Sequence, residues 1–241
     1  MLKIKQFMAK IIMFGNQKGG VGKTLVSVMT ATALGQAPFN LKVAIADLDD
    51  QKSVTYARDI DIQSYPEGTS LPFDVYSLTV PELQKKITEL DRDYDVLFID
   101  VAGKLDVNVD VTQQEITKTM MYVDLLFVPF IAGSYVFTAT YNYLAFAEQV
   151  KAARALQTRQ LQTYGFVNMY RSRSRANQML LQHIESLTEN NNLKMMENYL
   201  GDYALYKDSD TVSSVYDLNS SDSAAQNFAE WLNEFVNIIQ K

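Results

Sequence analysis

The sequence contains no cysteine and a single histidine, His183. Thiolate zinc sites, iron–sulfur ligation and cysteine nucleophiles are therefore excluded, and one histidine leaves little basis for a histidine metal centre or a Ser/His/Asp triad. No apolar run reaches the roughly eighteen residues of a membrane span, and the N-terminal apolar stretch lacks a small-residue cleavage site. We therefore expect a cytoplasmic protein that does not enter a membrane.

Basic residues are fewer than acidic residues, 22 against 28, so the net charge of the chain is −6. The whole molecule is thus not a polycation of the kind that coats nucleic acid. One window, residues 151–175, differs in that it carries six basic side chains and no acid. These are Lys151, Arg154, Arg159, Arg171, Arg173 and Arg175.

Short apolar runs alternate with helical patterns along the chain, which predicts βαβ units. The strands are expected at residues 9–14, 42–46, 94–99, 125–129 and 164–168, and the helices at 24–34, 81–90, 111–122, 135–155, 174–187 and 222–239. Residues 190–222 are rich in Asn, Asp and Ser and are interpreted as connections. The predicted fold is a single α/β domain over residues 1–241, a mostly parallel twisted sheet with helices on both faces.

A glycine-rich segment, GNQKGGVGKT at residues 15–24, lies between the first strand and the first helix. Its glycines allow backbone amides to turn toward an anion, and the helix N-terminus adds partial positive charge. Lys23 adds a full charge, and the Thr24 hydroxyl is a ligand for the magnesium that accompanies a triphosphate. Gln17 stands where the general pattern GxxxxGK[ST] has glycine, and an additional lysine, Lys18, precedes the glycine pair. The spacing excludes an NAD-type loop.

Acidic residues follow two of the predicted strands, at the edge where ligands bind open α/β sheets. Asp100 ends the apolar run YDVLFID, where a carboxylate can accept hydrogen bonds from metal-bound water. Asp49, in DLDDQ, is predicted to face the terminal phosphate and hold the attacking water. Its neighbours Asp47 and Asp50 remain alternatives on chemistry alone.

These segments together resemble the ParA/MinD family of deviant Walker A P-loop ATPases, in particular the small ParA-type plasmid partition ATPases. The similarity lies in KGGVGKT, VAIADLDDQ, YDVLFID and, more weakly, GFVNMY. It implies that Lys18 reaches the partner's phosphates across a dimer interface and that Asp49 supports hydrolysis. It further implies that Thr24 binds magnesium, with Asp100 in its outer shell, and that the nucleotide is held by Lys18, Gly19, Gly20, Val21, Gly22, Lys23, Thr24, Leu25 and, at the adenine, Asn168.

Two segments depart from the family pattern. Asp50 replaces the proline that usually follows the second aspartate of the DxD motif. After YDVLFID the chain reads VAGKLD instead of a proline-containing turn, and Gly103 is the candidate hinge there.

The resemblance implies a magnesium-dependent ATPase that converts ATP to ADP. ATP would close a homodimer on nonspecific DNA, and a ParB-like centromere-binding protein would stimulate hydrolysis during plasmid partition. The basic side chains of residues 151–175 are the candidate DNA contacts, or else a solvated helix face and an adenine-site loop. A different class of function is a switch in conjugation, transposition or polar localisation that uses the same cycle without DNA.

A membrane-binding C-terminal helix, as in the MinD branch, is the remaining alternative. The last helix carries an apolar stripe at helical spacing, made of Phe228, Trp231, Leu232, Phe235 and Ile239. Its polar face is acidic, which anionic lipid repels. The stripe is therefore predicted to pack in the core.

Overall fold

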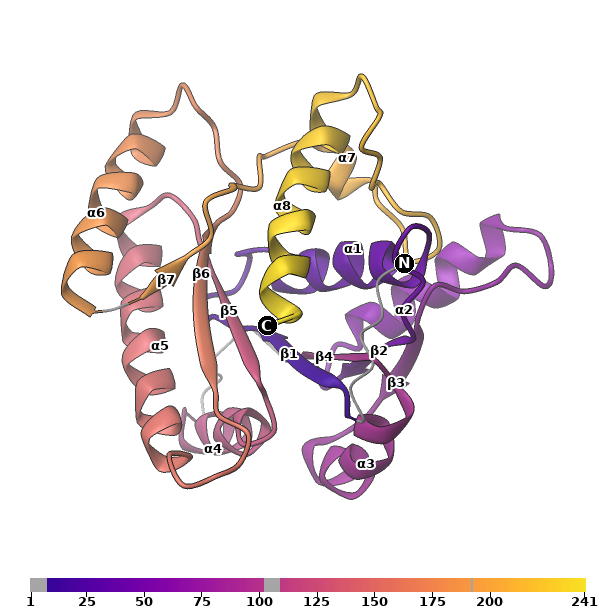
Figure 1. Cartoon of the computed structure of the whole chain (residues 1–241), viewed down its shortest axis with the longest axis horizontal. Coiled ribbons are helices and arrows are strands. Elements are labelled where there is room, and N and C mark those ends of the chain that lie inside the picture. The colour runs from indigo at the N-terminus through magenta and orange to yellow at the C-terminus, as the bar shows by residue number, and fades with distance from the viewer. Residues whose placement is uncertain (1–7, 102–108, 192) are drawn as a thin grey trace.

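The computed structural model describes residues 8–101, 109–191 and 193–241. Its centre is a parallel sheet of seven strands in the order β3-β2-β4-β1-β5-β6-β7 (Figure 1). The strands are β1 (Lys10–Phe14), β2 (Val43–Asp47), β3 (Asp74–Ser77), β4 (Val96–Asp100), β5 (Leu125–Phe130), β6 (Gln162–Val167) and β7 (Lys194–Met195). The five strands predicted from apolar runs are confirmed, and β1 lies between β4 and β5 near the middle of the sheet.

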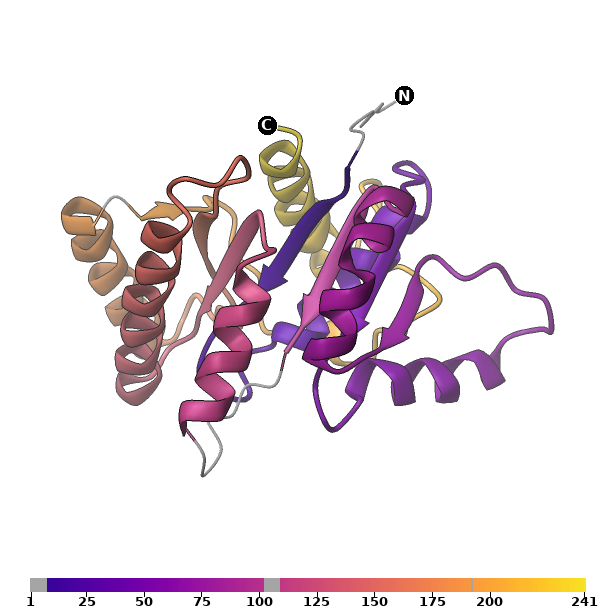
Figure 2. The same ribbon diagram turned by 90° about the horizontal axis from the view of Figure 1, so that it is seen from below.

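Two layers of helices enclose the sheet, as predicted. Buried side chains from α1 (Lys23–Gly35), α2 (Ser53–Asp61), α7 (Ala204–Lys207) and α8 (Ser223–Ile239) form one apolar core with the strands. The second core contains side chains from α3 (Val80–Asp93), α4 (Val109–Met120), α5 (Ser134–Ala153) and α6 (Arg175–Asn191). In Figure 2, α3, α4 and α5 lie in front of the strands and α8 lies behind them.

Local sequence explains where several of these helices begin. Thr79 caps α3 in a capping box with Glu82, and Asp222 caps α8 through the amides of Ala224 and Ala225. The apolar stripe of α8 is fully buried, with Phe228, Trp231, Leu232, Phe235 and Ile239 all 0% exposed. The predicted core role of this stripe is therefore confirmed, which leaves it unavailable for lipid. Within the described residues, no helix is long and apolar enough to cross a membrane.

Several short helices and strands were not predicted from the sequence. Helix α2, the 3-10 turn η1 (Ile62–Ser64) and edge strand β3 lie in a stretch for which no element was predicted. Helix α2 and η1 extend beyond the sheet at the edge that β3 forms (Figures 1 and 2). Residues 190–222, interpreted as connections, contain β7 and α7 as well. The predicted hinge Gly103 lies outside the described residues.

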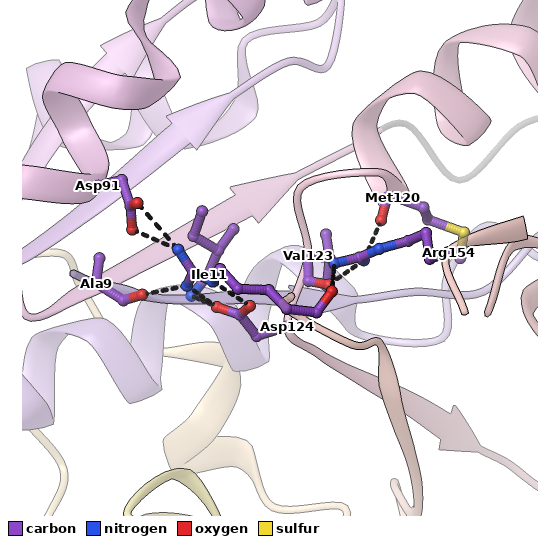
Figure 3. Close-up of polar contacts among 8 residues, drawn as sticks. Ala9, Ile11, Asp91, Met120, Val123, Asp124 and Arg154 are labelled. Carbon is purple, nitrogen blue, oxygen red and sulfur yellow. Dashed lines mark hydrogen bonds and ion pairs between the residues drawn. The ribbon is translucent and has the colours of Figure 1, made fainter. Parts of the chain in front are cut away.

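Near the amino ends of the strands, two arginines of the basic window bind polar groups of the protein. Figure 3 labels one of them, Arg154, with its partners Met120 and Val123. Arg154 is 1% exposed and donates hydrogen bonds to the carbonyls of Met120 and Val123. Met120 is the last residue of α4, and Val123 lies in the turn that follows it. Arg159 binds the carboxylates of Asp91, at 2.9 Å, and of Asp124. The prediction that Arg154 contacts DNA is therefore wrong, because its side chain is buried. The side chain of Arg159 is 30% exposed, but its guanidinium group is paired with two carboxylates, which argues against the predicted DNA contact.

Candidate functional site

The glycine-rich segment connects the carboxyl end of β1 to the first turn of α1. Gly20 and Gly22 adopt positive φ angles of 77° and 89°, which glycine accepts without steric cost. Gly15 packs against the Tyr143 ring so closely that a Cβ there would collide with its hydroxyl. The segment therefore needs glycine for its positive-φ turns and for its close contact with α5. It ends at a helix N-terminus, which is suited to bind an anion.

The two lysines of this segment have opposite environments. Lys23 is only 6% exposed, whereas Lys18 is exposed, as are Gly19 and Gly20. Burial lowers the pKa of Lys23, and the nearby carboxylates of Asp100 and Asp49 oppose that shift. The sequence thus places one cation inside the subunit at the start of α1 and a second one on the surface of the same loop.

Two asparagines hold the loop in place, and only one of them was a predicted site residue. Asn168, 5% exposed at the end of β6, donates to the Val21 carbonyl at 2.8 Å and lies against Gly22. Asn16, 3% exposed, accepts from the Lys18 amide at 2.9 Å. The motifs did not single out Asn16, because only the fold brings its partners to it. Leu25, predicted to bind nucleotide, packs against the apolar core of the α1 side and is half-buried.

The three candidate aspartates at the carboxyl end of β2 have different environments. Asp47 is fully buried and accepts from both the amide and the hydroxyl of Thr55 at the start of α2. Asp50 is exposed. Asp49 is half-buried and is near enough to Lys23 to act on its pKa. Within the described residues, its carboxylate accepts only from the Gln51 amide, at 2.9 Å. This environment favours Asp49 over its neighbours as the residue facing a bound phosphate.

Thr24 and Asp100 meet at the site, joined by a hydrogen bond of 2.8 Å from the hydroxyl to the carboxylate. Asp100 is 0% exposed, and its second oxygen is buried with no hydrogen-bond partner among the described residues. An unpartnered buried carboxylate oxygen beside a hydroxyl suits a hydrated Mg²⁺, which keeps several waters and takes few protein ligands. No group of three metal-binding side chains gathers among the residues with described positions.

This buried carboxylate leads to a prediction about pH. Burial raises the pKa of Asp100 to about 7, and Asp47 on the adjacent strand adds to that rise. The native state therefore holds a proton more tightly than the unfolded chain between about pH 4 and pH 7, so stability falls as pH rises through that range. Asp100→Asn, which has no such charge, is expected to gain up to about 3 kcal/mol over the wild type between pH 5 and pH 8.

Urea unfolding at the two pH values, in EDTA and without nucleotide, measures this gain. Asp50→Asn is the matched control, because Asp50 is exposed and its replacement should shift stability equally at both pH values. A constant difference between Asp100→Asn and wild type would contradict the prediction.

The other basic side chains of the window lie on the surface. Lys151 forms an ion pair with Glu148 at 3.1 Å, and Arg171 pairs with Asp202, which also binds Lys207 at 2.9 Å. Arg173 and Arg175 are exposed. The structure therefore leaves these last two as the most available cations of the predicted set.

Comparison with known proteins identifies the family and the fold. A model of the CobQ/CobB/MinD/ParA nucleotide binding domain matches residues 12–211. Solved structures of the same fold include a plasmid partition protein from Borrelia burgdorferi, which is 17% identical with a TM-score of 0.61 over 95% of this chain and 99% of that one. MinD from Aquifex aeolicus is 14% identical with a TM-score of 0.63 over 95% and 98% of the two chains.

A third similar structure is cobyrinic acid a,c-diamide synthase from Mycobacterium smegmatis with bound ADP and magnesium. It is 16% identical, with a TM-score of 0.66 over 95% of each chain. No curated protein sequence matches the chain. Because the family model spans most of the sequence and these folds match over nearly its whole length, the protein belongs to the CobQ/CobB/MinD/ParA family of nucleotide-binding domains.

Proposed function

We propose that this protein is a Mg²⁺-dependent ATPase of the ParA type that closes into a homodimer on ATP. The observation that carries the proposal is the pair of lysines on one loop, with Lys23 buried at the start of α1 and Lys18 exposed. A buried cation at a helix N-terminus serves the phosphates of its own subunit. An exposed cation two residues from the loop's first positive-φ glycine, Gly20, is available to a second subunit.

Each candidate residue has a role in this proposal. Backbone amides of residues 19–25 surround the phosphates, and Lys23 neutralises the β- and γ-phosphates. Magnesium, when bound, offsets charge that develops on the transferred phosphate, and Thr24 and Asp100 are the residues that would hold it with its waters. Asp49 orients the attacking water. Asn168, already bonded to the loop through its amide nitrogen, would contact the adenine with its remaining oxygen.

In the cycle that we propose, the protein moves its cargo along nonspecific DNA. The ATP dimer binds DNA, a ParB-like centromere-binding protein stimulates hydrolysis, and release of the dimer moves a plasmid. Two copies of Arg173 and Arg175 on one dimer supply the cations, together with Lys151 and Arg171 when their ion pairs open. Plasmid partition proteins among the structural neighbours support this choice of cargo.

A second candidate is a dimerising switch in conjugation, transposition or polar localisation that does not bind DNA. The burial of Arg154 and the internal ion pairs of Arg159 favour it, because they remove two of six cations from a chain of net charge −6. The two candidate functions share the nucleotide chemistry and differ only in whether the dimer binds DNA.

The test is to measure molar mass by light scattering with ATP and Mg²⁺, together with retention on random-sequence DNA at low salt. We expect ATP to double the mass of the wild type and to cause DNA retention that falls steeply with salt. Asp49→Ala should accumulate as an ATP dimer because it binds but hydrolyses slowly, by roughly a hundredfold or more. A monomer in every nucleotide state would refute the proposal, whereas a dimer without DNA retention would favour the second candidate.

The Asp49→Ala variant needs a control from the same segment. Asp50→Ala is suitable because Asp50 is exposed and follows Asp49 directly, so we expect its hydrolysis rate to stay within about twofold of the wild type. If Asp50→Ala traps the dimer and Asp49→Ala hydrolyses normally, then Asp49 has been assigned the wrong role.

A further inference from the structure

The Asn16 side chain makes three hydrogen bonds beneath the phosphate loop. Its Nδ2 donates to the Pro129 carbonyl at 3.0 Å, in β5, and to the Thr140 hydroxyl at 2.8 Å, in α5. Its Oδ1 accepts from the backbone amide of Lys18 at 2.9 Å. One buried side chain therefore joins a strand, a helix and the residue that carries the exposed lysine.

The surroundings fix which way this amide points. The Thr140 hydroxyl donates to the Val136 carbonyl at 2.9 Å, so its oxygen is left to accept from Asn16. The Pro129 carbonyl is also an acceptor, and the Lys18 amide can only donate. Reversing the Asn16 amide would set two acceptors against each other at Pro129 and two donors against each other at Lys18, so the side chain has a single favourable orientation.

We infer that Asn16 is a positioning residue that couples α5 to Lys18. The inference rests on the proposed role of Lys18 in the partner's site. In this role Asn16 does not act on the phosphate directly. Its side chain fixes the Lys18 backbone through one hydrogen bond, and the Thr140 hydroxyl fixes the Asn16 side chain through another. A shift of α5 along its axis would move the Thr140 hydroxyl and so change where the loop presents Lys18 to the second subunit.

The test uses Thr140→Val, which keeps the shape of threonine and removes only the hydroxyl that Asn16 needs. We expect the hydrolysis rate of the dimer to fall roughly five- to tenfold while the monomer's affinity for ATP stays within about twofold. Thr140→Ser restores the hydroxyl and should recover most of the rate. Asn16→Ala, which removes all three hydrogen bonds, should lower the rate further.

A double-mutant cycle with Lys18→Ala separates positioning from general damage to the fold. If Thr140 acts through Lys18, then Thr140→Val should cause little further loss of rate in the Lys18→Ala background. Equal losses in both backgrounds would overturn the inference, because Thr140 would then act elsewhere. If Lys18→Ala alone hydrolyses ATP at the wild-type rate, the proposed cross-subunit role of Lys18 has failed instead, so the two failures are distinguishable.

Discussion

Lys23→Ala is expected to lose nucleotide binding by at least about a hundredfold, which corresponds to about 3 kcal/mol. The side chain is 6% exposed at the first residue of α1, so no solvent cation can replace it there. A buried ammonium that meets phosphate oxygens forms charge-assisted hydrogen bonds in a site of low dielectric. Titration of a fluorescent ATP analogue with Mg²⁺, followed by displacement with ATP, measures the loss.

The control for this variant is Lys85→Ala, which removes an exposed lysine of α3 and leaves the phosphate loop intact. Its affinity for ATP should equal that of the wild type. Because burial already lowers the pKa of Lys23, removing that side chain is not expected to unfold the protein without nucleotide. A folded Lys23→Ala variant that binds ATP normally would contradict the phosphate site on which the proposed function depends.

The central part of the fold was predictable because its strands are buried on both faces. Residues 96–100 and 125–130 are continuously buried, and such strands appear in a sequence as unbroken apolar runs. Edge strand β3, Asp74–Ser77, has no fully buried residue, so it gives no such signal. Helix α2 buries only Val54 and Arg58, and one apolar side chain per two turns does not produce a recognisable helical stripe.

The residues of the candidate site also differ in whether the local sequence predicted them. Local motifs singled out the loop, Lys23 and Thr24, and the position of Asp100 at a strand end placed it in the same predicted site. The direct hydrogen bond between Thr24 and Asp100 was not predicted. The motifs also did not predict Asn16 bound to Thr140, since the two residues are 124 positions apart and only the sheet brings them together. Charge counting along residues 151–175 failed for a related reason. A local excess of arginine says nothing about acidic partners elsewhere in the chain.

Arg159→Leu is the clearest test of that correction, and we expect it to destabilise the fold by roughly 2–4 kcal/mol. Arg159 is bound to Asp91, 68 residues away, and to Asp124, 35 residues away, and both acidic side chains are largely buried. Removing the guanidinium leaves two buried carboxylates without their cation and the Ala9 carbonyl without a donor. The change in unfolding free energy can be measured by urea denaturation.

Two further variants show whether the loss comes from the unpaired carboxylates. Adding Asp91→Asn to Arg159→Leu removes one uncompensated charge, so the double variant should be more stable than the sum of the single effects predicts. Arg173→Leu replaces an exposed arginine of the same window and should change stability by no more than about 0.5 kcal/mol. DNA retention should respond in the opposite way, falling for Arg173→Leu and persisting for folded Arg159→Leu. If Arg159→Leu were stable and lost DNA retention, this arginine would be a DNA ligand after all, because its ion pairs would not be needed for the fold.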